Sequence, residues 1–512
     1  MTVYDEAFRR NRFGAGALSR RALICTGMVA AADDLLFRQP IGLSLPAFAL
    51  LVATGAMLAA GARGNRKHML AAALVLIAAL LPMVNGVRPL AVGFGLAGSI
   101  LFSLTVAGRF APSARPTADD FLWFGLTGCS WIILDSIAVV TWLRRRPRAG
   151  SRGAFLLSWI VPVLLFGTFL WLLSSANPLI EDWLAQFDLP ALLTDIDFPR
   201  VLFWCCILVV VWPFVGPRIR PRVDPAAIPF PLPPPIVDAP WKALVFGAPA
   251  ILRSLVLFNA LFAVQSVLDV TYLWNGAVLP DHLGYAAYAH RGAYPLVVTA
   301  LLAGAFLIAA TREGGQAARS RTIRVLIHVW TAQNLLLVAS SILRLDLYVA
   351  AYSLTYLRFA AFIWMLLTGT GLVLILVRMS FDRSNAWLIT SNVAALVCVL
   401  YVSSFIDLPR VISGYNVRHS LEMSENGSHL DVDYLQSLGP HALPALDDYI
   451  LHGRWTLPLA VWNACSIRRT LSASLAGEPA GWRGWSLNGW RLDRHLSDKD
   501  AAEAEAECLR IL

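Results

Sequence analysis

The sequence predicts an all-α fold: a polytopic transmembrane helical bundle of about eleven spans, within a range of about 10 to 12, followed by a short helical extramembrane tail. Hydrophobic residues make up 57% of the 512 residues, charged residues only 15%, and the mean hydropathy is +0.61. A soluble domain carries roughly 25% charged residues. The apolar residues gather in runs of about 20, which is the length of a membrane-crossing helix. The chain therefore belongs in a bilayer.

Twelve apolar segments are candidate spans. They are residues 22–37, 43–62, 69–85, 90–107, 121–143, 154–175, 199–216, 254–274, 293–311, 323–343, 359–377 and 386–407. Arginines in short loops mark the cytoplasmic side, so the arginine-rich N-terminus is expected in the cytoplasm. The basic stretch RRRPRAGSR at 144–152 must then also be cytoplasmic, which requires that 121–143 does not span. We interpret 121–143 as an interfacial helix, which leaves eleven spans and a periplasmic tail.

Composition divides the chain into four parts. They are an N-terminal transmembrane region (1–216), a proline-rich cytoplasmic linker (217–241), a C-terminal transmembrane region with outer Tyr/Arg loops (242–407), and an extracytoplasmic helical tail (408–512). In the tail, LDVDYLQSLGPHALPALDDYI predicts two short amphipathic helices broken at Gly439–Pro440, and SDKDAAEAEAECLRIL predicts a final helix. Cys465 and Cys508 could pair if the tail faces an oxidising compartment, and their spacing leaves this open.

Arginines and tyrosines gather at the predicted outer side. If residues 344–358 form one helix, a side chain recurs every four positions on one face from Arg344 to Tyr356. The outer loop before it and the segment after the last span carry the same chemistry. One interpretation is the aromatic and arginine belt of any bilayer interface. The other is a site that binds an anionic group. Its candidate residues are Arg291, Arg344, Arg358, Arg418, His290, Tyr348, Tyr352 and Tyr356.

Polar side chains also lie inside the predicted spans. Asn259, Gln265 and Asp269 share one span, and Gln333 and Asn334 share another. Because unpaired polar groups are costly in hydrocarbon, these side chains are expected to face protein or water. They are either contacts between helices or part of a polar path. The carboxylate of Asp269 could pair with an outer arginine or carry a proton.

Signatures of enzymes and of metal or nucleic-acid binding are missing from the sequence. It contains no GxSxG, HExxH or Walker-type motif, and its tail histidines lack metal-ligand spacing. We therefore expect no metal and no cofactor. The net charge of +9 is explained by basic cytoplasmic loops, and no concentrated basic domain predicts nucleic-acid binding.

Four stretches, in order, resemble motifs of a known family. YAHRGAYPL, ASSILRLDLYVAAYSLTYLR, YNVRHS and LDVDYLQSLGPHALPAL are similar to motifs of the bacterial inner-membrane family described as domain of unknown function 4173. The resemblance is clearest from about residue 240 to 450. It implies a multi-pass protein of the bacterial inner membrane and implies no reaction.

These observations together favour a non-enzymatic envelope protein, namely a sensor, accessory or scaffold subunit. Its outward Arg/Tyr/His surface would bind an anionic lipid or another envelope component. An alternative is a secondary transporter with a polar path between helices. A further alternative is a membrane-embedded transferase acting on a lipid-linked substrate, with Asp269 or Asp346 as the base.

Overall fold

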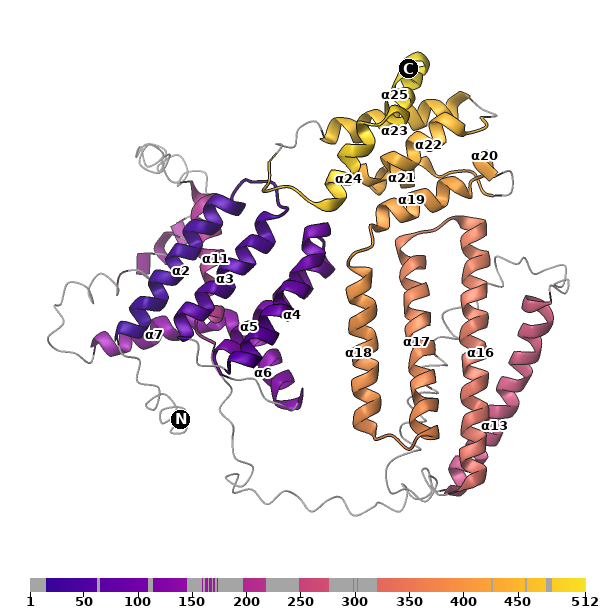
Figure 1. The fold of residues 1–512 in the computed structure, drawn as a ribbon, viewed down its shortest axis with the longest axis horizontal. Helices are drawn as coiled ribbons and strands as arrows, with labels where there is room; N and C mark the ends of the chain where they lie inside the picture. The colour runs from indigo at the N-terminus through magenta and orange to yellow at the C-terminus, as the bar shows by residue number, and fades with distance from the viewer. Residues whose placement is uncertain are drawn as a thin grey trace. The chain divides into compact units, whose positions relative to one another are not determined.

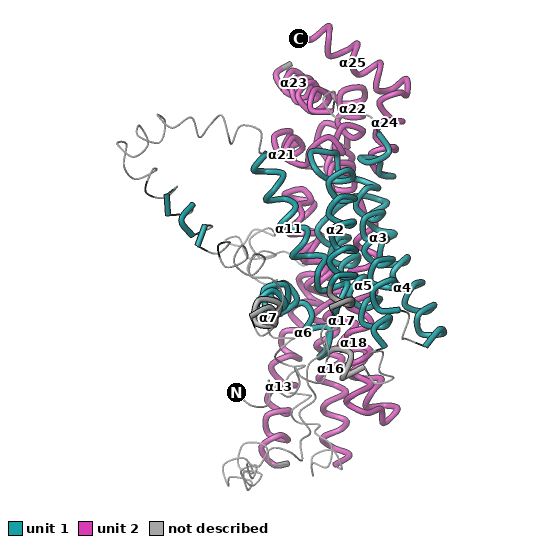
Figure 2. The backbone as a smooth tube through the Cα atoms, turned by 90° about the vertical axis from the view of Figure 1, so that its left-hand side faces the viewer, with its two compact units in different colours: residues 1–224, 479–487 teal, residues 225–478, 488–512 magenta. Residues whose placement is uncertain are grey.

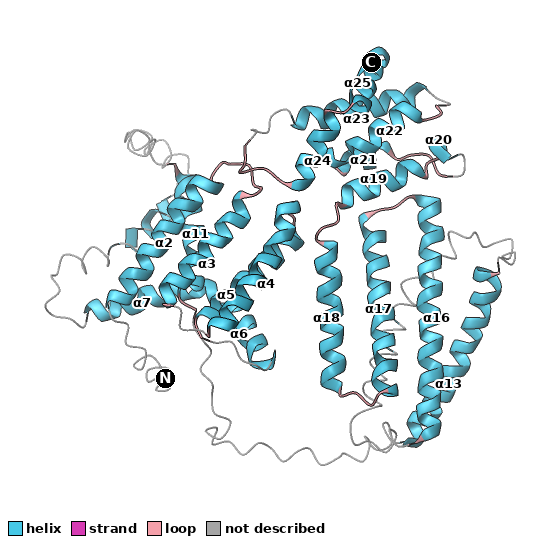
Figure 3. Ribbon diagram, in the orientation of Figure 1, coloured by secondary structure: helices cyan, strands magenta, loops and turns pink. Residues whose placement is uncertain are grey.

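The computed structural model describes nine stretches of the chain, which are residues 15–61, 65–108, 114–144, 197–217, 248–275, 320–424, 427–455, 458–475 and 481–512, together with a few helical positions between 159 and 302. These residues form helices and connecting loops, with no strand among them (Figure 3). The all-α prediction is confirmed for this part of the chain. The predicted linker 217–241 and the predicted spans 154–175 and 293–311 lie almost wholly outside it.

The chain folds into two compact units (Figure 2). Unit 1 comprises residues 1–224 together with 479–487, and unit 2 comprises residues 225–478 together with 488–512. The inclusion of residues 479–487 in unit 1 was not predicted, because those residues lie deep in the predicted tail.

Unit 1 is a helical bundle (Figure 1). Its elements are α2 (Ala15–Leu36), α3 (Ser44–Ala60), α4 (Arg66–Asn85), α5 (Pro89–Val106), α6 (Ala114–Thr127), η1 (Gly128–Ser130), α7 (Trp131–Arg144) and α11 (Phe198–Val215). Helices α4 and α5 form a hairpin that packs closely because Gly98 has no side chain: a Cβ there would lie 2.7 Å from the Cβ of Ala79. Small residues at such contacts are typical of membrane helices.

The segment 121–143 is interrupted in the structure. Helices α6 and α7 have 14 residues each and are separated by the short 3-10 turn Gly128–Ser130. A helix of 14 residues is about 21 Å long, which is shorter than the roughly 30 Å of hydrocarbon. Neither piece alone is long enough to cross. Its interfacial position stays a prediction.

Unit 2 contains four long helices and a smaller helical tail (Figure 1). The long helices are α13 (Ala248–Leu268), which continues as the π-helix η3 (Asp269–Trp274), α16 (Arg321–Tyr352), α17 (Tyr356–Ser380) and α18 (Asn385–Ser403). The tail comprises α19 (Leu408–Arg418), α20 (Leu421–Ser424), α21 (Val432–Ser437), η4 (Pro440–Ala442), α22 (Leu443–His452), α23 (Pro458–Leu475), α24 (Leu487–Leu496) and α25 (Lys499–Ile511).

Seven helices among the described residues are long and apolar enough to cross a membrane. They are α4, α5, α11, α13 with η3 (249–274), α16, α17 and α18. Each coincides with a predicted span, and α3 is a shorter apolar helix of 17 residues. The chain is therefore a helical membrane protein, while the predicted count of about eleven spans is not confirmed.

The predicted helix across residues 344–358 is wrong. Helix α16 ends at Tyr352 and α17 begins at Tyr356. Between them Ser353 has a φ of 67°, which lies in the left-handed region and cannot continue a right-handed helix. The hydroxyl of Thr355 then accepts the N–H of Arg358 and caps α17. The segment is a tight turn between two spans and not a separate outer helix.

Two hydrogen bonds of Asn416 are among the contacts that hold the tail to this turn. Asn416 of α19 accepts the N–H of Leu354 through Oδ1 at 2.6 Å and donates from Nδ2 to the carbonyl of Leu354 at 3.0 Å. Both bonds are buried, so they satisfy two backbone groups that water cannot reach. The tail helix α19 therefore packs on the α16–α17 turn.

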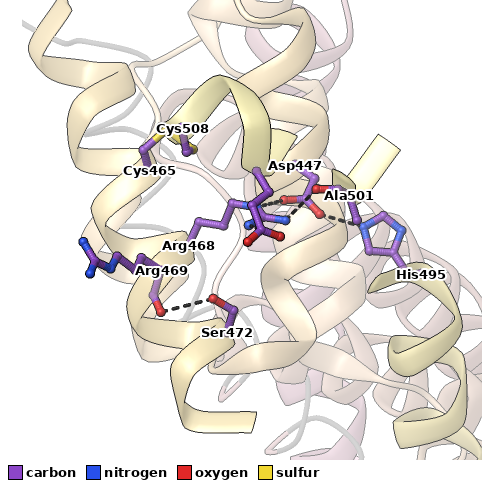
Figure 4. Close-up of polar contacts among 9 residues, drawn as sticks. Asp447, Cys465, Arg468, Arg469, Ser472, His495, Ala501 and Cys508 are labelled. Carbon is purple, nitrogen blue, oxygen red and sulfur yellow. Dashed lines mark hydrogen bonds and ion pairs between the residues drawn. A yellow bond between two sulfur atoms is a disulfide. The ribbon is translucent and has the colours of Figure 1, made fainter. Parts of the chain in front are cut away.

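The tail has a core of its own. The predicted helix break at Gly439–Pro440 separates α21 from η4. The predicted final helix is α25, Lys499–Ile511. Asp447 is 1% exposed, accepts from Nε of Arg468 at 2.7 Å, and lies 2.9 Å from Nε2 of His495 (Figure 4). Cys465 and Cys508, whose pairing the spacing left open, form a disulfide between α23 and α25.

Loss of this disulfide should loosen the tail. The bridge closes a stretch of 43 residues, and removing a crosslink over that length costs about 4 kcal/mol in the chain-entropy model. Cys465→Ser should therefore increase proteolysis of the tail in the full-length protein, without release of the membrane-embedded part. Cys25→Ser, which removes an unpaired thiol, is the control. Equal protection of both variants, or free thiols at both positions on labelling, would contradict the pairing.

Candidate functional site: a buried ion pair below an Arg/Tyr surface

A buried ion pair joins α13 to α16. The guanidinium of Arg344 donates from Nη2 to Oδ1 of Asp269, and the two side chains are only 3% and 1% exposed. Gln265, one turn earlier on α13, donates to the same oxygen at 2.8 Å. Two charges taken out of water are tolerated because they neutralise each other and are hydrogen-bonded.

The backbone at Asp269 departs from the ordinary α-helix. Residues Asp269–Trp274 form a π-helix, an insertion that is rare in helices and frequent at functional sites. Trp274, the last residue of this turn, donates from Nε1 to the hydroxyl of Ser340 at 3.1 Å. The π-helix is thus anchored to α16 at two points, through Asp269 and through Trp274.

Arg344 does not lie on an open outer face. The sequence placed it among the arginines for an external anion, whereas the structure buries it against Asp269. This arrangement matches the other possibility considered for Asp269, an acid paired with an outer arginine. Along α16, Arg344 is buried, Tyr348 is half-buried and Tyr352 is 52% exposed.

Arg358 closes the end of α16. Its Nη1 donates to the carbonyls of Tyr352 and Ser353, which have no partner within the helix. Its guanidinium also lies 4.5 Å from the ring centroid of Tyr348 and 6.0 Å from that of Tyr352. These contacts fix the guanidinium plane. Among the described residues no side chain or carbonyl accepts from Nε or Nη2, so this edge of the guanidinium can donate to a ligand.

Two further tyrosines border this arginine. Tyr356 is 41% exposed, and its N–H donates to the hydroxyl of Tyr434 at 3.3 Å. Burial raises the pKa of the Tyr434 phenol, while the Tyr356 N–H and the positive charge of Arg358 oppose that rise. We call Tyr348, Tyr352, Tyr356 and Arg358 the tail-side surface.

The remaining sequence candidates are not joined to this surface. Arg418 is exposed at the end of α19, and no contact with Arg358 is described for it. His290 and Arg291 lie outside the described residues. Sequence reasoning missed Asn416 and Tyr434. Both lie in stretches with a family resemblance, YNVRHS and LDVDYLQSLGPHALPAL, but residue type alone indicates no contact with the α16–α17 turn.

The other intramembrane polar residues bridge the same two helices. Asn259 donates to the carbonyl of Leu326 at 3.2 Å, and Gln333 donates to the carbonyl of Asn259 at 3.3 Å. Asn334 donates to the carbonyl of Trp330 at 2.8 Å within α16. The amide nitrogens thus find partners between or within helices, as interhelical contacts require.

Several buried oxygens, in contrast, have no hydrogen-bond donor among the described residues. They are Oδ1 of Asn259, Oδ2 of Asp269, Oε1 of Gln333 and Oδ1 of Asn334. Each is an acceptor that a water, a proton or a cation would satisfy. No group of three or more His, Cys, Asp or Glu in the described part of the chain has a geometry for holding a metal ion.

These features define a multi-pass helical membrane protein with a buried charge pair in one unit. A family model matches residues 24–449, most of the chain, and the chain belongs to that family, described as domain of unknown function DUF4153. The family number suggested by the sequence resemblance, 4173, is therefore corrected to 4153. No curated protein matches, and no solved structure matches.

The ion pair should be strongly coupled. Asp269→Ala leaves a buried arginine without its carboxylate and should lower the free energy of unfolding by about 3–5 kcal/mol. The apolar pair Asp269→Leu with Arg344→Met should recover most of that loss, because it removes both charges. Unfolding in lipid nanodiscs measures both variants.

An exposed ion pair provides the matched control. Arg510 and Glu507 lie 3.0 Å apart with side chains 77% and 41% exposed, so Glu507→Ala should cost no more than about 1 kcal/mol. If Asp269→Ala costs as little as this control, the charge pair does not hold α13 to α16.

Proposed function

We propose that this chain is a non-enzymatic, multi-pass protein of the bacterial inner membrane, an envelope sensor, accessory or scaffold subunit. Its tail-side surface binds the headgroup of an anionic lipid or a similar envelope component. Arg418, Arg291 and His290 are the further residues proposed for this ligand. The N-terminus lies in the cytoplasm and the tail in the periplasm.

The observation that carries the proposal is the held guanidinium of Arg358. Its Nη1 donates to the last carbonyls of α16, and its Cζ lies 4.5 Å from the centroid of the Tyr348 ring. No described residue accepts from the opposite edge, formed by Nε and Nη2. An arginine edge with two parallel N–H groups matches a phosphate or carboxylate. Tyr352 and Tyr356 lie exposed at the ends of their helices, where tyrosines meet lipid headgroups.

The periplasmic side of the tail is supported by its cysteines. A disulfide between Cys465 and Cys508 persists in an oxidising compartment such as the bacterial periplasm and is rare in the cytosol. Arg321 and Arg324 in the first turn of α16, and Arg378 in the last turn of α17, lie at the helix ends opposite the tail. Both arguments support a position of the tail-side surface in the outer leaflet.

A test of the surface must spare the cap on α16. Arg358→Lys keeps the positive charge but replaces the two-pronged guanidinium with a single ammonium group. Because bidentate contact is lost, retention of phosphatidylglycerol should fall by about tenfold. Native mass spectrometry of protein released from mixed-lipid nanodiscs measures the retention. The matched control is Arg410→Lys, at an exposed arginine of α19.

The comparison between these two variants tests whether the tail-side surface binds a specific lipid. If Arg358→Lys and Arg410→Lys retain phosphatidylglycerol equally, the surface is an ordinary interfacial belt. Tyr352→Ala with Tyr356→Ala provides a second measure, because it removes two exposed rings and keeps Arg358 and its closer ring contact with Tyr348.

A secondary transporter is the second candidate, and the buried acceptor oxygens favour it. Asn259, Gln333 and Asn334 lie near the middle of their helices, and Asp269 lies nearer the tail, so the four oxygens are staggered along α13 and α16. Such a series suits a path for protons or cations. The transferase alternative has less support, because among the described residues neither Asp269 nor Asp346 contacts Arg358, the arginine proposed for the anion.

Transport predicts a specific effect of Asp269. In proteoliposomes containing a pH-sensitive dye, Asp269→Asn should slow gradient-driven proton entry by about tenfold or more, because the amide cannot exchange a proton. Asp346→Asn, at an exposed position of α16, should leave the rate unchanged. Equal rates in both variants and in empty liposomes would exclude proton transport.

A further inference from the structure

We infer that unit 1 carries a separate lipid site, an apolar slot that takes an acyl chain of a zwitterionic phospholipid such as phosphatidylethanolamine. The headgroup lies over the arginine and aspartate side chains at the end of α2. This inference is independent of the proposed function, which concerns residues of unit 2.

The slot is a cavity of about 170 Å³ between α2, α3, α4, α5 and α11. Its lining is almost wholly apolar and includes Phe48, Val52, Met83, Val211 and Phe214. An apolar cavity of about 150 Å³ stays dry and accepts a small hydrocarbon. The slot is therefore large enough for several methylene groups and is unsuited to water.

The slot is elongated along the helices. On α3 its lining runs from Leu45 to Val52, and on α5 from Val92 to Ser99. Seven residues of helix rise about 10 Å, which is roughly a third of the hydrocarbon thickness. Both stretches begin within the first turns of their helices, so the slot runs from that end of the bundle towards its middle.

Helix α11 connects the slot to a charged end. Ile207, Val211 and Phe214 line the cavity and recur at helical spacing on one face. Two turns earlier, the same face carries Arg200. Its guanidinium donates from Nε to Asp33 at 2.9 Å and lies 5.6 Å from the Trp204 ring.

The charges at this end alternate in sign. Leu36 lines the slot and is followed two positions later by Arg38, whose side chain is 68% exposed and 3.2 Å from Asp197. Asp34 is 72% exposed and lies 3.0 Å from Arg483. Each pair thus exposes one charge, the arginine in the first pair and the aspartate in the second. Exposed groups of both signs are complementary to a phosphate and an ammonium together, and not to a purely anionic headgroup. This complementarity selects the zwitterionic lipid.

Filling the slot tests the acyl-chain site. Ala49 lines the cavity, and the next residue, Leu50, is 46% exposed on the outside of the helix. Wild-type protein from nanodiscs of equal phosphatidylethanolamine and phosphatidylglycerol should retain phosphatidylethanolamine in native mass spectrometry. Ala49→Phe should reduce that retention by about tenfold, and the control Leu50→Phe should not. Val92→Phe, on α5, serves if Ala49→Phe does not fold.

The headgroup requires a separate pair of variants. Arg38→Gln and Asp34→Asn should each weaken retention of phosphatidylethanolamine, and Arg38→Gln should leave the phosphatidylglycerol retention attributed to Arg358 unchanged. Equal retention by Ala49→Phe, Val92→Phe and wild type would overturn the site. Preferential loss of phosphatidylglycerol on filling the slot would overturn the choice of lipid.

Discussion

The buried ion pair between Asp269 and Arg344 decides where α13 meets α16, and much of unit 2 depends on that contact. In hydrocarbon, a charged side chain has to find its partner inside the protein. The pair therefore restricts the two helices to one register, more strictly than apolar packing alone would. It also places the π-helix Asp269–Trp274 against Ser340, and it places the last turns of α16 where Arg358 can close them.

Strong local signals made most of the fold predictable. Long apolar runs identify spans because the bilayer demands both length and backbone satisfaction, and all seven membrane-crossing helices found in the described residues coincide with predicted runs. Gly439–Pro440 predicted a helix break in the tail because glycine and proline interrupt helices locally. The total number of spans is a different matter, because α3 is apolar but has only 17 residues, and α6 and α7 have 14 residues each.

The site was less predictable because its decisive contacts join distant parts of the chain. Spacing by four extended the helical pattern from Arg344 through Ser353, where one residue with positive φ ends the helix. A serine has no strong signal for that conformation. The pairing of Asp269 with Arg344, 75 positions away, and the contact of Asn416 with Leu354 depend on tertiary packing that spacing does not reveal.

Residues 481–487 pack against the start of α3 although they lie far from it in the sequence. Leu43 and Ser44, at the start of α3, donate backbone N–H groups to the carbonyls of Trp485 and Arg483, and Arg483 pairs with Asp34 across 449 positions of sequence. A ribosome adding about 5–20 residues per second makes this segment about 20 to 90 seconds after α2 and α3. Until residues 483–485 are made, the two N–H groups at the start of α3 therefore lack the carbonyl acceptors that they have in the folded protein.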